Sequence, residues 1–205
     1  MTTALQNQFG EIDIYLFDQL LRGRIRPGMR ILDAGCGEGR NLVYALRAGY
    51  DVFGCDADAT AIDAVRRLVA RLAPRLPRDN FRVEPIEQMT FPDAHADVVL
   101  ASAVLHFAAD DSQFRAMVNE CWRVLRPGGM LFTRLASSIG SEHQVRPIAG
   151  RRFWLADGSE RYLIDATLLE DLTAELRGTL VDPLKTTVVQ DQRSMTTWVL
   201  RKPAA

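Results

Sequence analysis

The stretch ILDAGCGEGRN, residues 31–41, decides the fold of this chain. An apolar run leads into three glycines at alternate positions, and a segment with helical periodicity follows them. A strand, a glycine-rich turn and a helix in this order are typical of doubly wound α/β sheets, which bind nucleotide-like ligands at the carboxyl ends of their strands. The glycines allow positive φ angles and a close approach of the backbone to a ligand.

The spacing of these glycines argues against a pyrophosphate ligand. A dinucleotide fingerprint that begins at Gly35 requires a third glycine at position 40, which is arginine. A fingerprint that begins at Gly37 requires glycine at position 42, which is leucine. Asp33, at the end of the strand, repels a pyrophosphate but attracts a cationic ligand such as an ammonium or a sulfonium.

A second aspartate supports the same interpretation. Asp56 ends the run DVFGCD, residues 51–56, and lies 23 positions after Asp33. A carboxylate at this point of a nucleotide-binding sheet accepts hydrogen bonds from ribose hydroxyls. We therefore expect a cationic nucleoside between two adjacent strand ends, with one carboxylate on each side.

Short apolar runs alternate with helical periodicity from residue 29 to residue 135, which predicts a parallel sheet with crossover helices. Further strands are expected at 81–85, 96–102 and 129–135, and a terminal strand pair at 184–190 and 195–202. The predicted fold is therefore α/β, with a doubly wound, mostly parallel seven-stranded sheet. Helices cover both faces, and the C-terminal strand pair is antiparallel.

The composition excludes several classes of protein. Hydrophobic residues make up 47% and charged residues 25% of the chain, as in globular proteins. A formal net charge of -1 removes the attraction to phosphates on which nucleic-acid binders depend, so no nucleic-acid partner is expected. No apolar run approaches the roughly 18 residues of a membrane span, and residues 1–13 do not resemble a secretory signal. Three scattered cysteines favour a reducing, cytoplasmic compartment and predict no metal site.

Four motifs resemble those of class I S-adenosylmethionine-dependent methyltransferases. They are ILDAGCGEGRN, GCDAD, FPDAHADVVLASAVLHF at 91–107 and LRPGGMLF at 125–132. The resemblance covers roughly residues 30–135 and, more loosely, the terminal strand pair. Residues 37–56 are similar to tellurite- and thiopurine-methylating members, which act on small molecules. The resemblance implies S-adenosylmethionine as cofactor, S-adenosylhomocysteine as product and a small-molecule methyl acceptor.

The resemblance also implies which residues bind the cofactor. Asp33, Ala34, Gly35 and Gly37 surround its methionine part, Asp56 binds the ribose, and Ala57 packs on the adenine. Ile86 and Glu87 hold the amino edge of the adenine, and Ala101 and Ser102 lie beneath the sulfonium. Family members often carry an acidic residue where this chain has Pro85, which leaves the adenine contact to a backbone amide or to Glu87.

His106 is the candidate catalytic residue, because a neutral histidine beyond the fourth strand can accept a proton from the methyl acceptor. The alternative is a histidine packed between Leu105 and Phe107 at the start of a helix. Four arginines either attract an anionic acceptor or form a solvated rim; they are Arg146, Arg151, Arg152 and Arg161.

One domain, residues 1–205, is expected in four parts. Residues 1–28 form a helical cap, with Ile12, Leu16, Leu20 and Leu21 along one side, and residues 29–135 form the cofactor-binding core. Residues 136–163 form an insertion on the acceptor side, with a hairpin turn at Asp157-Gly158. Residues 164–205 form the last helix, capped by Asp165, and the strand pair. Asp111 or Ser112 is expected to cap the helix before the fifth strand.

Three alternative functions stay open. They are a non-catalytic domain that senses S-adenosylmethionine, an RNA or protein methyltransferase, and an NAD(P)-dependent oxidoreductase. The arginine at position 40 disfavours the last of these, because a dinucleotide site needs glycine there. The identity of the acceptor and the oligomeric state do not follow from the sequence.

Overall fold

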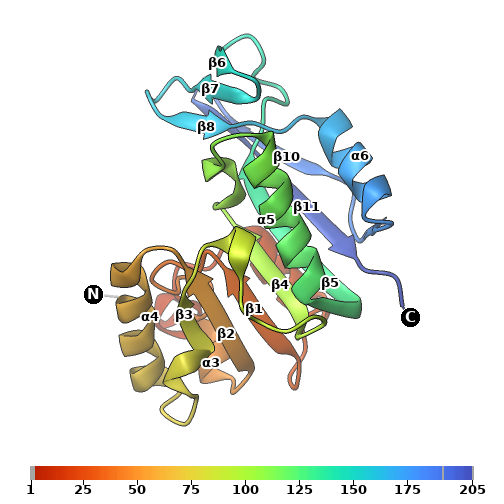
Figure 1. Cartoon of the computed structure of the whole chain (residues 1–205). Coiled ribbons are helices and arrows are strands. Elements are labelled where there is room, and N and C mark those ends of the chain that lie inside the picture. The colour runs from red at the N-terminus through yellow and green to blue at the C-terminus, as the bar shows by residue number, and fades with distance from the viewer. Residues whose placement is uncertain (1–2, 191, 205) are drawn as a thin grey trace.

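A computed structural model describes residues 3–190 and 192–204 of the chain. Its main sheet has the strand order β10-β11-β5-β4-β1-β2-β3, and the short β9 also pairs with β11 (Figure 1). β3, β2, β1, β4 and β5 are parallel, whereas β11 is antiparallel to both β5 and β10. The predicted fold class is therefore confirmed, with β9 as an additional two-residue strand. The strands are β1 (Arg30–Ala34), β2 (Asp51–Asp56), β3 (Phe81–Val83), β4 (Ala96–Ser102), β5 (Leu125–Ala136), β9 (Thr179–Leu180), β10 (Lys185–Val189) and β11 (Arg193–Arg201).

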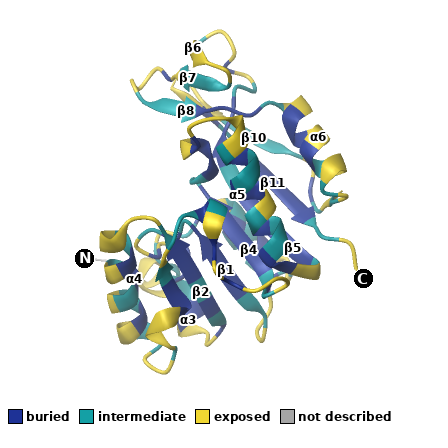
Figure 2. Ribbon diagram, in the orientation of Figure 1, coloured by how far each residue is buried: buried dark blue, intermediate teal, exposed yellow. Residues whose placement is uncertain are grey.

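Helices pack on both faces of this sheet, because its strands alternate apolar side chains between the two faces. In β4, Val99 packs with helices α5 and α6, whereas Val98 and Leu100 pack with α2, α3 and α4. Figure 2 shows the central strands buried between these layers. The helices are α1 (Ala4–Phe9), α2 (Ile14–Leu21), α3 (Val43–Arg47), α4 (Ala59–Leu72), α5 (Asp111–Val124) and α6 (Ala166–Glu175), with short 3-10 helices η1 (Arg78–Asn80), η2 (Ile86–Gln88) and η3 (Leu105–Phe107).

The N-terminal segment is helical, as expected, and forms two helices. One of the four apolar residues that were predicted to share one side does not face the core. Leu16 is buried in α2, and Leu20 packs against the same core. Leu21 is 71% exposed. Residues four positions apart share a helix face, whereas the next residue is rotated away from it, so Leu21 cannot follow Leu20 inward.

The helix termini agree in part with the predicted caps. Asp165 caps α6 by accepting a hydrogen bond from Leu168 N at 2.8 Å, as predicted. The cap of α5 is Asp110, whose carboxylate accepts from Gln113 N at 2.8 Å, so the prediction of Asp111 or Ser112 is wrong. Three consecutive side chains of similar capping ability made the choice ambiguous in the sequence.

A second, small sheet lies beyond the main one (Figure 1). It contains β6 (Arg146–Ala149), β7 (Arg152–Trp154) and β8 (Glu160–Tyr162), all antiparallel. The predicted hairpin turn at Asp157-Gly158 connects β7 to β8, and Gly158 has a φ of 78°. Among the described residues, no helix is both long and apolar enough to cross a membrane.

Candidate functional site

The candidate site lies where the strand order reverses. β1 has β2 on one side and β4 on the other, so the sheet is extended in both directions from β1. In doubly wound sheets, a ligand crevice opens outside the carboxyl ends of the strands at this point. Asp33 and Ala34 end β1, Asp56 ends β2 and Ser102 ends β4. The fold therefore brings these expected residues to one edge of the sheet.

The turn after β1 depends on its glycines. Gly35 has a φ of 76° and Gly37 a φ of 51°, in the left-handed region that side chains disfavour. A Cβ atom on Gly35 would lie 2.4 Å from Cγ2 of Val104. The amides of Gly35 and Cys36 both donate to the carbonyl of Cys55, at 2.8 and 2.9 Å, which fixes the turn against the end of β2.

Asp33 is buried beneath this turn. The residue is 1% exposed, and its Oδ2 atom has no hydrogen-bond partner among the described residues. Burial raises the pKa of the Asp33 carboxyl to about 7, and the negative charge of Asp56 adds to the rise while Arg40 opposes it. A buried carboxylate without a partner is unfavourable, so a cationic group placed beside it is strongly attracted.

Asp56 is held in place by two backbone amides. Its Oδ2 accepts a hydrogen bond from Gly37 N at 2.9 Å, and its Oδ1 accepts from Asp58 N at 3.0 Å. The carboxylate borders a cavity of about 180 Å³, which we call the first cavity. Its lining residues are Gly35, Asp56, Ala57, Pro85, Ile86, Glu87, Val104, Phe107, Gln113 and Met117.

The loop after β3 supplies one wall of the first cavity. Ile86 and Glu87 lie in η2, and Glu87 Oε1 accepts a hydrogen bond from Gln113 Nε2 at 2.6 Å. Gln113 and Met117 of α5 also line the first cavity, although no motif in the sequence indicates a site there. Five of the expected cofactor residues, namely Gly35, Asp56, Ala57, Ile86 and Glu87, therefore meet at one cavity.

Three other expected cofactor residues do not line the first cavity. Ala34 and Ala101 are completely buried in the core, so neither presents surface to the first cavity. Ser102 is 7% exposed, and its Oγ atom has no hydrogen-bond partner among the described residues. Ser102 pairs with Arg134 of β5, at the point where the sheet edge meets a second cavity.

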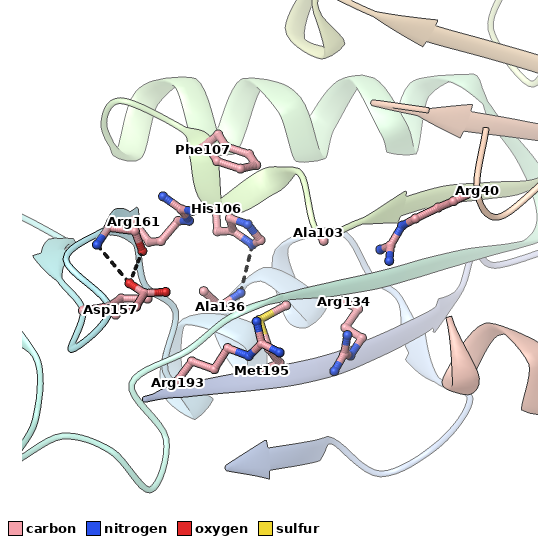
Figure 3. Close-up of a pocket in the computed structure, with 12 residues that line it drawn as sticks. Arg40, Ala103, His106, Phe107, Arg134, Ala136, Asp157, Arg161, Arg193 and Met195 are labelled. Atoms are coloured by element: carbon pink, nitrogen blue, oxygen red, sulfur yellow. Dashed lines mark hydrogen bonds between the residues drawn. The ribbon is translucent and has the colours of Figure 1, made fainter. Parts of the chain in front are cut away.

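The second cavity, of about 310 Å³, lies between β4, β5, β11 and the small sheet (Figure 3). One wall carries Phe107, which also lines the first cavity. At its edge Ala103 has a φ of 62°, and its amide donates to the Arg134 carbonyl at 2.7 Å. The lining residues are Arg40, Ala103, His106, Phe107, Arg134, Ala136, Leu155, Asp157, Ser159, Arg161, Arg193 and Met195.

His106 lines the second cavity and is 6% exposed. Its Nδ1 atom accepts a hydrogen bond from Ala136 N at 3.1 Å (Figure 3). A neutral imidazole whose Nδ1 accepts carries its proton on Nε2, so Nε2 is a donor. Burial, together with the positive charges of Arg161 and Arg134, lowers the pKa of His106 to about 4. This histidine is therefore neutral near pH 7.

The residues that β5 and β11 contribute were not expected from the sequence. Arg134, Arg193 and Met195 line the second cavity from these strands. Arg134 is the one charged residue in the otherwise uncharged strand segment GMLFTRL, which is a signal of a special position. Its guanidinium donates to Asp13 Oδ2 at 3.1 Å, whereas its Nε atom is buried without a partner in the part of the chain that the structure describes.

Comparison with known proteins identifies the family. Residues 32–133 match the model of a methyltransferase domain family. The ubiquinone biosynthesis O-methyltransferase of Methylocella silvestris is 30% identical over 181 residues, which cover 81% of this chain and 68% of that protein. This chain belongs to the class I S-adenosylmethionine-dependent methyltransferase superfamily.

Other relatives of this methyltransferase are longer. A probable S-adenosylmethionine-dependent methyltransferase of Mycolicibacterium smegmatis is 32% identical over 157 residues, which cover 75% of this chain and 54% of that protein. The chain thus spans little more than half the length of that curated relative. Among solved structures, an S-adenosylmethionine-dependent methyltransferase of Methanosarcina mazei has a TM-score of 0.73 and 20% identity, covering 91% of this chain and 98% of that one. This likeness confirms the methyltransferase fold.

The residues present fit S-adenosylmethionine. The unpartnered Oδ2 of Asp33 suits a positively charged group, and the turn at Gly35 has no room for a side chain. The first cavity combines apolar side chains, which suit a flat purine, with the fixed carboxylate of Asp56, which suits a diol. Among the described residues, no group of three or more His, Cys, Asp and Glu side chains has an arrangement that could hold a metal ion.

Proposed function

We propose that this methyltransferase transfers a methyl group from S-adenosylmethionine to a small-molecule acceptor. The observation that carries the proposal is the pair of adjoining cavities at the carboxyl ends of the strands. The first cavity is lined by the carboxylate of Asp56 and by Gly35 of the turn that covers Asp33, and the second is large enough for a small molecule. Phe107 borders both, so a ligand in one cavity lies next to a ligand in the other.

The proposed cofactor contacts follow the family motifs. Asp33, Gly35 and Gly37 hold the methionine part, with Ala34 supporting the turn from the core. Asp56 accepts hydrogen bonds from the ribose, and Ala57 packs on the adenine. The other proposed contacts are Ile86 and Glu87 at the amino edge of the adenine, and Ala101 and Ser102 behind the sulfonium.

S-adenosylmethionine, when bound, supplies a methyl group on a positively charged sulfur. The chain contributes alignment and exclusion of water, which are effective because a near-attack geometry removes much of the entropic barrier. The residues 136–163, expected on the acceptor side, supply Leu155, Asp157, Ser159 and Arg161 to the second cavity. We propose that this segment shapes the acceptor site. The three free, buried cysteines support a reducing, cytoplasmic compartment.

Two experiments test this function. Isothermal titration calorimetry with S-adenosylmethionine, S-adenosylhomocysteine, NAD and NADP distinguishes the methyltransferase from an oxidoreductase, and we expect binding of the first two ligands only. An acceptor library is then screened for release of S-adenosylhomocysteine. Binding of NAD or NADP alone contradicts the proposal. Cofactor binding without turnover across the library favours a non-catalytic sensor domain instead.

A further inference from the structure

The second cavity has an excess of positive charge. Its lining includes the four arginines Arg40, Arg134, Arg161 and Arg193, and the one acidic residue is Asp157. The Asp157 carboxylate already accepts hydrogen bonds from the amide and the hydroxyl of Ser159, at 2.9 and 2.6 Å. Such an excess is unfavourable in a partly enclosed space unless an anion occupies it.

The four arginines differ in the partners that their guanidinium groups already have within the protein. Arg40 belongs to the glycine turn and acts on Asp33, so it lies at the cofactor end of the cavity. Arg134 pairs with Asp13. Arg161 stacks on Phe107, with its guanidinium carbon 4.7 Å from the ring centre, and donates one hydrogen bond to the Glu160 carbonyl.

Arg193 has no ion pair or hydrogen bond from its side chain within residues 3–190 and 192–204. Figure 3 shows Arg193 and Arg161 near the end of the cavity that faces the small sheet, away from Arg40. The carboxylate of Asp157 lies at this end too and attracts both arginines, so two positive charges face one negative charge there. Arginine is suited to this role because its planar guanidinium binds a carboxylate through two parallel hydrogen bonds.

His106 provides a second, independent observation. His106 is only 6% exposed, and it lines the second cavity. Its Nδ1 accepts from Ala136 N, so the proton lies on Nε2. Nε2 has no hydrogen-bond partner within the described part of the chain. Nε2 is not among the fully buried atoms that lack a partner, so this donor is accessible from the cavity. An acceptor atom of a ligand there can take its hydrogen bond.

We propose that the methyl acceptor is a small carboxylic acid whose carboxylate is held by Arg161, Arg193 and the Nε2–H of His106. This inference rests on the proposed function and specifies the acceptor class of the same site. His106 acts here as a hydrogen-bond donor that positions the acceptor, and not as the base. An acceptor that arrives ionised at neutral pH needs no base to bind in this way.

The apolar lining residues of the second cavity indicate the chemistry of the rest of the acceptor molecule. Ala103, Phe107, Ala136, Leu155 and Met195 are apolar, and they line the same cavity of about 310 Å³. This volume is at the lower end of ligand sites, which span roughly 300–1,000 Å³. A compact apolar or aromatic body that carries one carboxylate fits both the walls and the charge.

The test compares two probes of equal shape, 4-fluorobenzoate and 4-fluorobenzamide, by ¹⁹F NMR titration of protein saturated with S-adenosylhomocysteine. Charge-assisted hydrogen bonds contribute about 1.5–3 kcal/mol, so we expect the benzoate to bind at least about tenfold more tightly. Arg193→Gln is expected to remove most of this preference while the affinity for 4-fluorobenzamide stays within about twofold. Arg193 is the informative position because its side chain makes no hydrogen bond or ion pair in the described structure and acts on Asp157 only through its charge.

Arg146→Gln is the matched control, because Arg146 is an exposed arginine of the small sheet that does not line the cavity. Equal affinity for the two probes, or no saturable binding of either, overturns the carboxylate proposal. A loss of preference in Arg146→Gln equal to that in Arg193→Gln also overturns it, because the effect is then one of general charge. Failure of S-adenosylhomocysteine to bind contradicts the proposed function separately, and the probes are then compared on the unloaded protein.

Discussion

Replacing Asp33 with asparagine tests the electrostatic basis of the site. A free aspartate has a pKa near 3.9, whereas burial raises that of Asp33 to about 7. Because the folded pKa is raised, the folded protein is favoured at low pH, where the carboxyl is neutral in both states. Wild-type stability then falls as the pH rises from about 4 to about 7, and one pKa unit corresponds to about 1.4 kcal/mol.

Asp33→Asn removes this pH dependence, because an amide of the same shape carries no charge. The unfolding free energy of the variant relative to wild type is expected to grow by about 2 kcal/mol between pH 5 and pH 7 and to level off above pH 8. Urea denaturation of the ligand-free proteins across this range measures it. Asp79→Asn, at an exposed aspartate, is the control and should leave the profile parallel to that of wild type. A parallel profile for Asp33→Asn refutes the reasoning.

Cofactor binding supplies the second half of this test. A cationic ligand favours the ionised carboxyl, so S-adenosylmethionine should displace a proton from Asp33. With a pKa of about 7, about nine-tenths of the carboxyl is neutral at pH 6, and up to about 0.9 proton is released per ligand there. Calorimetry in phosphate and in Bis-Tris buffer, which differ in ionisation enthalpy and both buffer at pH 6, measures this release. Asp33→Asn should release none of it and should bind the cofactor at least about tenfold more weakly. Buffer-independent enthalpies for wild type at pH 6 contradict the assignment.

Three further substitutions and one titration follow from the geometry. Asp56→Ala loses the bonds from Gly37 N and Asp58 N and should raise the dissociation constant for S-adenosylmethionine at least about tenfold; calorimetry that finds no change excludes a ribose contact. Gly35→Ala should lower the unfolding free energy by about 2–4 kcal/mol, because it combines a left-handed φ with a clash at Val104. Gly37→Ala should cost only about 1–2 kcal/mol, because no atom lies within 4 Å of the added Cβ; urea denaturation showing equal losses contradicts this. The imidazole of His106 has a pKa lowered to about 4, so ¹⁵N NMR should show a neutral Nε2–H tautomer throughout pH 5–8, and a titration within that range disproves it.

The sequence predicted which residues meet at the carboxyl ends of β1 and β2, where we propose the cofactor site, because the relevant signals are local. The glycine turn, Asp33 and Asp56 lie within 24 consecutive residues, and the parallel arrangement of β1 and β2 brings their ends together. The period of two in the strands and 3.6 in the helices likewise predicted the layers of the fold. Two local predictions were wrong. The cap of α5 is Asp110, and Leu21 faces away from the core.

The acceptor side was only partly predictable, because its walls come from segments far apart in the chain. Arg134 in β5 and Arg193 in β11 lie 59 positions apart in the sequence and meet because the antiparallel pairing sets Met195 opposite Ala136. No local pattern encodes that register. The role of His106 was also hidden, since its tautomer follows from a hydrogen bond with Ala136, 30 positions further along.

The ring of Phe107 forms part of the wall of both the first and the second cavity. Any molecule that presses on it from one side changes the space left on the other. Because this one ring is 60% exposed and lines both spaces, its replacement by a smaller side chain is expected to alter binding on both sides at once.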